Sequence, residues 1–147
     1  MAELFTTSWV TIQGMDTGAY ASGDAIGIGF SLTVPEQGIL EKVLITDLAG
    51  AESVIDVVLF NESFVGATNN SAFDMTDSDR RKLVGYSTVS SYASFNDNSL
   101  GQATSLSLDY DLQGVETIRG QLVSRGTPTY AVGDLLVQFT IIPYSSL

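Results

Sequence analysis

The stretch AIGIGFSLTV, residues 25–34, decides the fold class of this chain. An apolar side chain stands at every second position, with glycine, serine or threonine between, at Ile26, Ile28, Phe30, Leu32 and Val34. This period of two is typical of a β-strand with one buried face, so we expect all five side chains to point into a core. Pro35 ends the strand, because proline has no N–H to donate to a neighbouring strand.

Short segments of similar character recur along the chain with Gly- and Ser-rich turns between them. Two of them, residues 39–48 and 54–60, are β-branched and apolar and are compatible with a hairpin joined by a loop of several residues. Residues 4–12 have the pattern of an edge strand. Further strands are expected in residues 82–90, 104–112, 116–124 and 135–142.

Only TDSDRRKLVG, residues 76–85, has a helical pattern. Thr76 is placed to act as the N-cap, and Asp79 follows three residues later in a carboxylate version of the capping box. The sequence therefore predicts an all-β protein: an antiparallel, jelly-roll-like β-sandwich of about eight strands with one short helix. Residues 1–147 are expected to form a single domain, with residues 1–12 as an N-terminal arm or edge strand.

Charge and composition exclude several classes of function. The chain has 147 residues, of which 17 are acidic and 6 basic, and its formal net charge is −11. Nucleic acids and anionic membranes are held mainly by Lys and Arg, so we expect neither as a partner. Cysteine and histidine are absent, which excludes disulfides, thiolate catalysis and zinc sites built from those residues. We recognise no signal peptide and no apolar run long enough to span a membrane.

Two acidic clusters are candidate sites of chemistry. Asp74, Asp77 and Asp79 lie near two asparagines and could supply oxygen ligands for calcium, but helix capping already accounts for two of them. Asp109 and Asp111 could act as the paired carboxylates of a glycosidase, but they share the polar face of a predicted strand. We therefore expect no enzyme activity, no metal and no cofactor.

Two short stretches near opposite ends of the chain are almost alike: YASGD, residues 20–24, and YAVGD, residues 130–134. The apolar positions that follow them differ in phase by one residue, which would turn the side chains to opposite faces of a strand. We therefore predict that each is the same turn leading into a strand, built by glycine and an aspartate that bonds nearby N–H groups.

A few residues have the character of a protein interface. Trp9 is the only tryptophan and stands in the N-terminal edge strand together with Phe5. The RGTPTY loop, residues 125–130, combines two residue types that are enriched at interfaces with a stiffening proline. The candidate interface residues are therefore Phe5, Trp9, Arg125, Pro128 and Tyr130.

Several segments together resemble a family of small virion structural proteins of tailed bacteriophages, regarded as head decoration (cement) proteins. They are YASGD (20–24), VLITD (43–47), DVVLF (56–60), AFDMTDSDRRKLVG (72–85) and LVSRGTPTYAVGDLLVQF (122–139). The resemblance implies a β-sandwich that sits on the outside of the capsid as an oligomer. On this basis we expect a homo-oligomer, a dimer or trimer, that is made in the host cytoplasm and binds the major capsid protein on the virion.

Two other classes of function stay open at this point. One is a carbohydrate-binding module, or a fibre- or tail-associated protein that binds the host surface, which would need at least two exposed aromatic side chains on one face. The other is a hydrolase, which would need two carboxylates in a cleft.

Overall fold

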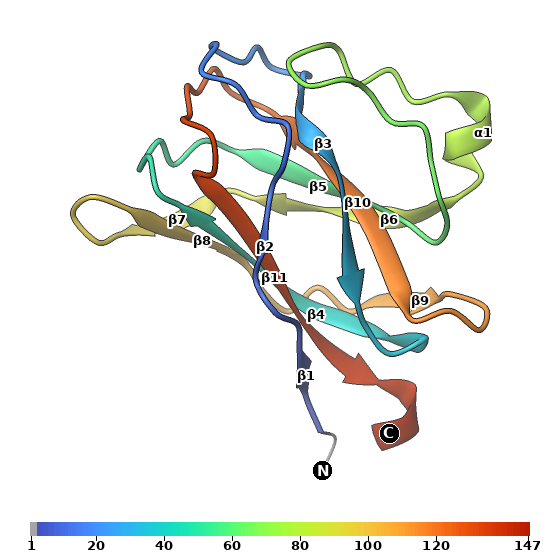
Figure 1. Cartoon of the computed structure of the whole chain (residues 1–147). Coiled ribbons are helices and arrows are strands. Elements are labelled where there is room, and N and C mark those ends of the chain that lie inside the picture. Colours follow the sequence, from blue (N-terminus) through green and yellow to red (C-terminus); the bar gives the residue numbers. More distant parts are fainter. Residues whose placement is uncertain (1–2) are drawn as a thin grey trace.

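The computed structural model describes residues 3–147 and consists of two antiparallel sheets that face each other (Figure 1). The larger sheet contains β1 (Phe5–Thr6), β2 (Val10–Thr11), β4 (Gln37–Asp47), β7 (Ser91–Ser94), β8 (Ser99–Ala103), β9 (Leu108–Asp111) and β11 (Leu135–Pro143). The smaller sheet contains β3 (Ala25–Thr33), β5 (Ile55–Phe60), β6 (Leu83–Val89) and β10 (Thr117–Ser124). The helical elements are α1 (Asp77–Arg80) and a 3₁₀ turn, η1 (Tyr144–Ser146).

The topology is that of a jelly roll. The small sheet has the order β3-β10-β5-β6, and the large sheet has the order β1-β11-β4-β8-β7, with β2 also paired to β11 and β9 to β4. The chain crosses between the sheets after β2, β3, β4, β6, β9 and β10, which gives the interlocked Greek keys of this fold. The predicted all-β, antiparallel sandwich is confirmed.

The core fills the space between the two sheets, and the alternating side chains of β3 contribute to it as predicted, with one exception. Ile26, Phe30, Leu32 and Val34 are buried, but Ile28 is 51% exposed. Three residues of β3 lie opposite one residue of β10, because Ile26 pairs with Leu122 and Phe30 with Gly120. The expectation for Ile28 was therefore wrong, since this bulge turns its side chain outward.

The expected pairing of residues 39–48 with residues 54–60 is also wrong, because β4 and β5 belong to different sheets. The fully buried carboxylate of Asp47 ends β4 and accepts hydrogen bonds from the N–H groups of Ala49, Gly50 and Glu52 at 2.9–3.0 Å. This turn redirects the chain toward the second sheet. The hairpin of β7 and β8 was not predicted, because its strands are short and rich in serine.

The long connection between β5 and β6, together with α1, covers part of the outer face of the small sheet (Figure 1). Phe64 stacks on Phe60 with ring centroids 4.0 Å apart, and Phe73 and Met75 pack on the same cluster. The predicted Thr76 cap is confirmed, because the Asp79 N–H donates to the Thr76 hydroxyl at 3.0 Å. The second half of the predicted capping box is not found in residues 3–147, since the Asp79 carboxylate accepts from the N–H groups of Val65 and Gly66 instead.

The two similar turns are confirmed as the same structure. Gly23 and Gly133 both have positive φ, +96° and +86°. Asp24 accepts a hydrogen bond from the Ala21 N–H at 3.0 Å, and Asp134 accepts one from the Ala131 N–H at 2.8 Å.

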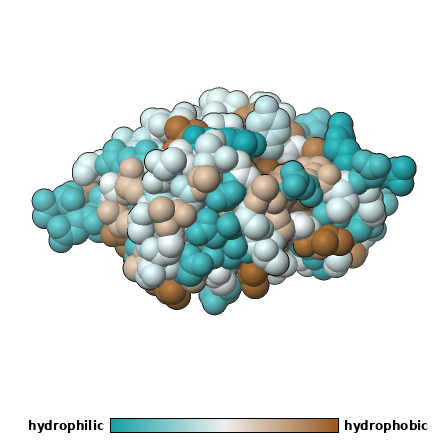
Figure 2. All heavy atoms as spheres, turned by 90° about the horizontal axis from the view of Figure 1, so that it is seen from above, coloured by the Kyte–Doolittle hydropathy of each residue, from teal (hydrophilic) through white to brown (hydrophobic). Residues whose placement is uncertain are grey.

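Seen from above, the surface of the protein carries apolar residues as separate small spots among polar ones (Figure 2).

The N-terminal segment runs along β11 as the predicted edge strand, broken into β1 and β2. Residues 1–2, which belong to the predicted arm, lie outside the described residues. Between β1 and β2 the chain bulges, and the Thr7 hydroxyl accepts a hydrogen bond from the Phe139 N–H at 3.1 Å. Within residues 3–147, no helix is long and apolar enough to cross a membrane.

Candidate functional site: the open edge of β3

Within residues 3–147, no strand pairs with the outer edge of the small sheet along the C-terminal half of β3. The Val34 N–H donates to the Glu116 carbonyl oxygen at 3.0 Å, which makes these two residues a hydrogen-bonded pair. Hydrogen-bonded and non-bonded pairs alternate in an antiparallel ladder. Ser31 and Thr33 occupy the non-bonded positions of this ladder. Their backbone N–H and C=O groups therefore point away from β10, toward the open edge.

A groove lies between this edge and the N-terminal segment. Its volume is about 290 Å³, and it is lined by Phe5, Thr6, Thr7, Ser8, Val10, Ser31, Leu32 and Thr33. The N-terminal wall is anchored to β11, because the Gln138 side chain donates to the Thr7 carbonyl oxygen at 3.0 Å. This groove combines apolar side chains with the free backbone groups of β3.

A second groove lies on the outer side of the same edge. Its volume is about 200 Å³, and it is lined by Gly29, Phe30, Ser31, Ser63, Phe64, Val65 and Arg119. Gly29 keeps it open, since a Cβ at this position would lie only 3.0 Å from the Phe64 ring. Ser31 lines both grooves, so they flank one short length of strand.

The edge lacks the features that usually protect a strand from pairing. Residues 25–34 contain no charged residue and no proline, whereas natural edges commonly carry Lys, proline or inward-pointing charges. The N-terminal half of β3 is closed, because the Ile28 N–H donates to the Gln13 carbonyl oxygen at 2.9 Å. An added strand could therefore pair only with residues 29–33. In strand addition, main-chain hydrogen bonds provide affinity and pockets for alternate side chains provide specificity.

The structure brings only part of the predicted interface residues to this site. Phe5 lines the inner groove, and Trp9, which is 39% exposed, lies between β1 and β2. Pro128 and Tyr130 are buried, so the structure corrects their proposed role as contact residues. The phenol of Tyr130 packs between the sheets, and burial raises its pKa.

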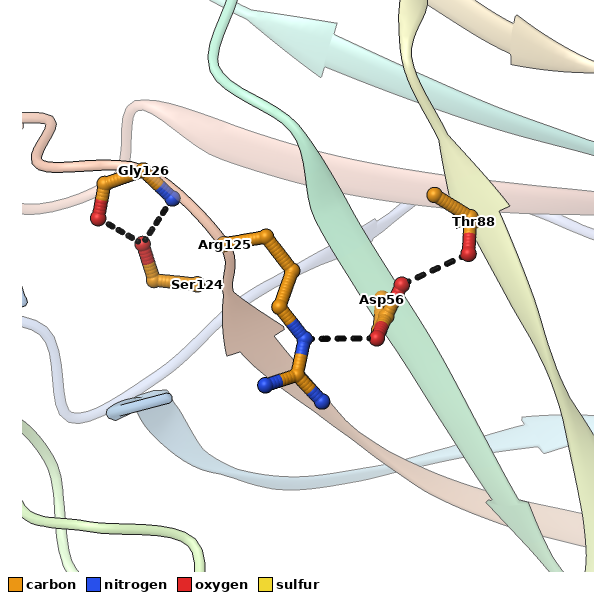
Figure 3. A network of polar contacts seen from close by, with 5 residues as sticks. All are labelled: Asp56, Thr88, Ser124, Arg125 and Gly126. Carbon is orange, nitrogen blue, oxygen red and sulfur yellow. Dashed lines mark hydrogen bonds and ion pairs between the residues drawn. The ribbon is translucent and has the colours of Figure 1, made fainter. Parts of the chain in front are cut away.

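Arg125 is exposed but belongs to another part of the surface (Figure 3). Its Nε donates to Oδ2 of Asp56 at 2.7 Å, and the Thr88 hydroxyl donates to Oδ1 of the same carboxylate at 2.7 Å. Beside it, the Ser124 hydroxyl and the backbone of Gly126 form a tight turn. Arg125 therefore lines a pocket on the outer face of β5 and β6 and is absent from both β3 grooves.

The acidic candidates have structural or solvated positions. Asp79 is buried and accepts hydrogen bonds from the N–H groups of Val65 and Gly66, each at 2.9 Å. Asp109 and Asp111 are exposed on β9, as predicted. No group of three or more acidic, histidine or cysteine side chains that could hold a metal ion was found in residues 3–147.

One further pocket contains two carboxylates. Its volume is about 280 Å³, and its lining includes Glu36, Glu116 and Tyr144. Both glutamates are exposed, whereas the general acid of a glycosidase commonly has apolar surroundings that keep it protonated. This pocket does not supply the pair of contrasting environments on which such a mechanism depends.

Sequence reasoning missed the open edge of β3, although a signal was present. The same alternation that identified the strand also contained no charge, and an uncharged strand can be either central or an exposed edge. Only the sheet order distinguishes these cases.

No family model matches this chain, and no similar sequence was found among curated proteins.

Proposed function

We propose that this chain is a structural protein of a tailed-bacteriophage particle that decorates the outside of the head. It would be made in the host cytoplasm, associate with itself and bind the major capsid protein. The observation that carries this proposal is the open, uncharged edge of β3 with a groove on each side. The jelly-roll fold is used by viral capsid and lectin domains, and the sequence resemblance to head decoration proteins favours the same role.

The edge of β3 suits a protein whose task is to hold a neighbour. An extended segment of the partner would form main-chain hydrogen bonds with residues 29–33 and place alternate side chains in the two grooves. The inner groove suits an apolar side chain, because Phe5, Val10 and Leu32 line it. The outer groove suits a polar or acidic one, because Arg119 lies there.

Repetition over a shell would turn weak individual contacts into a stable coat. Each copy that binds assembled capsid and not the separated subunits stabilises the assembly by mass action. Copies that also associate with one another bind with a higher effective concentration. The net charge of −11 opposes close approach of copies, and the uncharged β3 edge is a place where such contact costs little electrostatic repulsion.

The direct test is to mix the purified protein with phage capsids that lack it and to sediment the particles. We expect saturable binding at a fixed ratio to the major capsid protein, and capsids that resist heat and low salt better than bare ones. Light scattering of the free protein gives its oligomeric state. Absence of stoichiometric binding, or binding without any gain in particle stability, would refute the proposed role.

A further inference from the structure

The outer face of the small sheet carries a separate pocket at the uncovered end of β5 and β6. Its volume is about 360 Å³, and it is lined by Asp56, Val58, Phe73, Met75, Tyr86 and Arg125. This volume falls within the range of small-molecule sites, about 300–1,000 Å³. The connection between β5 and β6 covers the neighbouring cluster of apolar side chains but leaves this end of the sheet accessible.

The pocket is built around an exposed aromatic ring. Tyr86 stands directly opposite Val58 in the β5–β6 pairing, and 64% of its surface is exposed. Phe73 and Met75 come from the long connection and form the adjoining apolar wall. Tyr86 is therefore the one exposed ring of this shallow pocket, and the partly buried Phe73 extends its apolar wall. A single exposed ring with an adjoining apolar wall can stack on one sugar residue.

The polar side of the pocket is an ion pair that is held in place. Arg125 is fixed at its backbone, where its N–H donates to the Val54 carbonyl oxygen at 2.9 Å, and at its side chain by the 2.7 Å contact with Asp56. The bond to Asp56 uses Nε, and the two terminal nitrogens point away from the carboxylate (Figure 3). They form no other hydrogen bond with residues 3–147, so their N–H groups remain available to a ligand.

The charge of the pocket indicates what kind of ligand fits. Arg125 and Asp56 neutralise each other locally, while the whole chain carries a net charge of −11. An anionic ligand would therefore gain little from the arginine and would be repelled by the rest of the protein. A purely apolar ligand would leave the ion pair desolvated and its free donors unpaired.

We propose that this pocket binds a neutral glycan. The apolar C–H face of a sugar ring would stack on Tyr86, and adjacent hydroxyl groups would accept from the terminal nitrogens of Arg125 and donate to the Asp56 carboxylate. The ion pair holds the arginine before the ligand arrives, which lowers the entropic cost of binding. This inference does not depend on the proposed role on the capsid and uses a different surface from the β3 edge.

The test is a titration of the ¹⁵N-labelled protein with neutral trisaccharides of glucose, galactose, mannose and N-acetylglucosamine, followed by NMR. We expect at least one of them to shift the amide signals of β5 and β6 and to bind more tightly than trigalacturonate. Tyr86→Ala should weaken this binding by about tenfold or more, the size expected when a stacked ring is removed. Arg125→Gln should weaken it as well while leaving the ring in place.

Phe95→Ala is the matched control, because Phe95 is also a strongly exposed aromatic residue, at 60%, but lies on the β7–β8 turn. It should leave glycan binding unchanged, and Tyr86→Ala should leave capsid binding unchanged. The proposal is overturned if no neutral trisaccharide shifts these signals, if trigalacturonate binds best, or if both alanine variants lose binding equally. Thermal unfolding of each variant confirms that it is folded.

Discussion

The rings of Tyr20 and Tyr130 pack against each other with centroids 6.1 Å apart and planes tilted by 51°. These are the first residues of the two similar stretches near opposite ends of the chain. The Tyr20 N–H also donates to the Pro128 carbonyl oxygen at 2.9 Å. The two turns therefore lie together and link the strands that follow them, β3 and β11, in different sheets. Their similarity reflects a shared structural role at one end of the sandwich.

The two tyrosines should respond differently to replacement by phenylalanine. The Tyr20 hydroxyl donates to the Asn69 side-chain oxygen at 2.7 Å, whereas the buried Tyr130 hydroxyl, 2% exposed as a residue, has no hydrogen-bond partner in residues 3–147. Tyr20→Phe should lower the free energy of unfolding by about 1 kcal/mol. Tyr130→Phe should leave it unchanged or raise it by up to about 1 kcal/mol, because a buried unpaired hydroxyl is removed.

Urea denaturation of both variants beside the unaltered protein measures these differences. Because both substitutions remove a phenolic hydroxyl from one of two rings in contact, each serves as the control for the other. Equal loss of stability in the two variants would show that the Tyr130 hydroxyl also has a hydrogen-bond partner, and would contradict the prediction.

Alkaline pH should destabilise the fold through its buried tyrosines. Burial raises the pKa of Tyr20, Tyr92, Tyr110 and Tyr130, with hydrogen bonds partly offsetting this in Tyr20. Above the ordinary phenol pKa of about 10, the unfolded chain releases protons that the folded protein retains, so the unfolded state becomes favoured as pH rises. Each phenol that stays protonated costs up to about 1.4 kcal/mol of stability per pH unit.

Denaturation curves recorded from about pH 8 to about pH 11.5, a range that spans the ordinary pKa of a phenol, test this expectation. Stability should be flat at the lower end and fall above the ordinary phenol pKa, and the fall should be shallower in Tyr130→Phe. Absorbance of ionised tyrosine, followed in parallel, should rise together with unfolding. Titration of all tyrosines at the ordinary value in a protein that stays folded would contradict it.

Gln121 should be essential for holding the long connection against the small sheet. Its buried side chain donates to the carbonyl oxygens of Ala67 and Gly27, at 2.7 and 3.1 Å, and accepts from the Ala67 N–H at 3.1 Å. Gln121→Ala removes these partners and leaves buried backbone groups unpaired, which should cost about 2–4 kcal/mol. Proteolysis should then begin within residues 61–76, where the connection loosens. Gln102→Ala, at an exposed position of β8, should change neither property.

Much of the fold could be predicted because it is recorded in local patterns. The alternation in β3, the Thr76 cap and the two glycine–aspartate turns depend on residues that are close in sequence. The assignment of β4 and β5 to different sheets does not depend on such local residues. Two apolar strands that follow each other along the chain have the same sequence pattern whether they pair with each other or belong to different sheets. The outward turn of Ile28 was hidden for a related reason, because the bulge depends on contacts with β10 and Asn69.

The candidate sites were harder to predict than the fold. The composition of the RGTPTY loop suggested an exposed interface, but Tyr130 is needed inside the sandwich and only Arg125 reaches the surface. The partners of Arg125 are Asp56 on β5 and, through that carboxylate, Thr88 on β6, which are distant in sequence. No local pattern joins three residues that meet only when the small sheet forms.

A charge placed on the open edge of β3 should abolish partner binding while preserving the fold. Ser31 is exposed and lines both grooves, so Ser31→Lys would put a long cation beside Arg119 in the path of an added strand. Lysine on an edge is a common natural means of preventing strand addition. We expect binding to capsids, and self-association if it uses the same edge, to weaken by at least about tenfold, equivalent to about 1.4 kcal/mol.

The matched control is Ser91→Lys on β7, the edge of the other sheet, which should bind as before. Equal binding by both variants, with unchanged thermal unfolding, would show that the contact surface lies elsewhere.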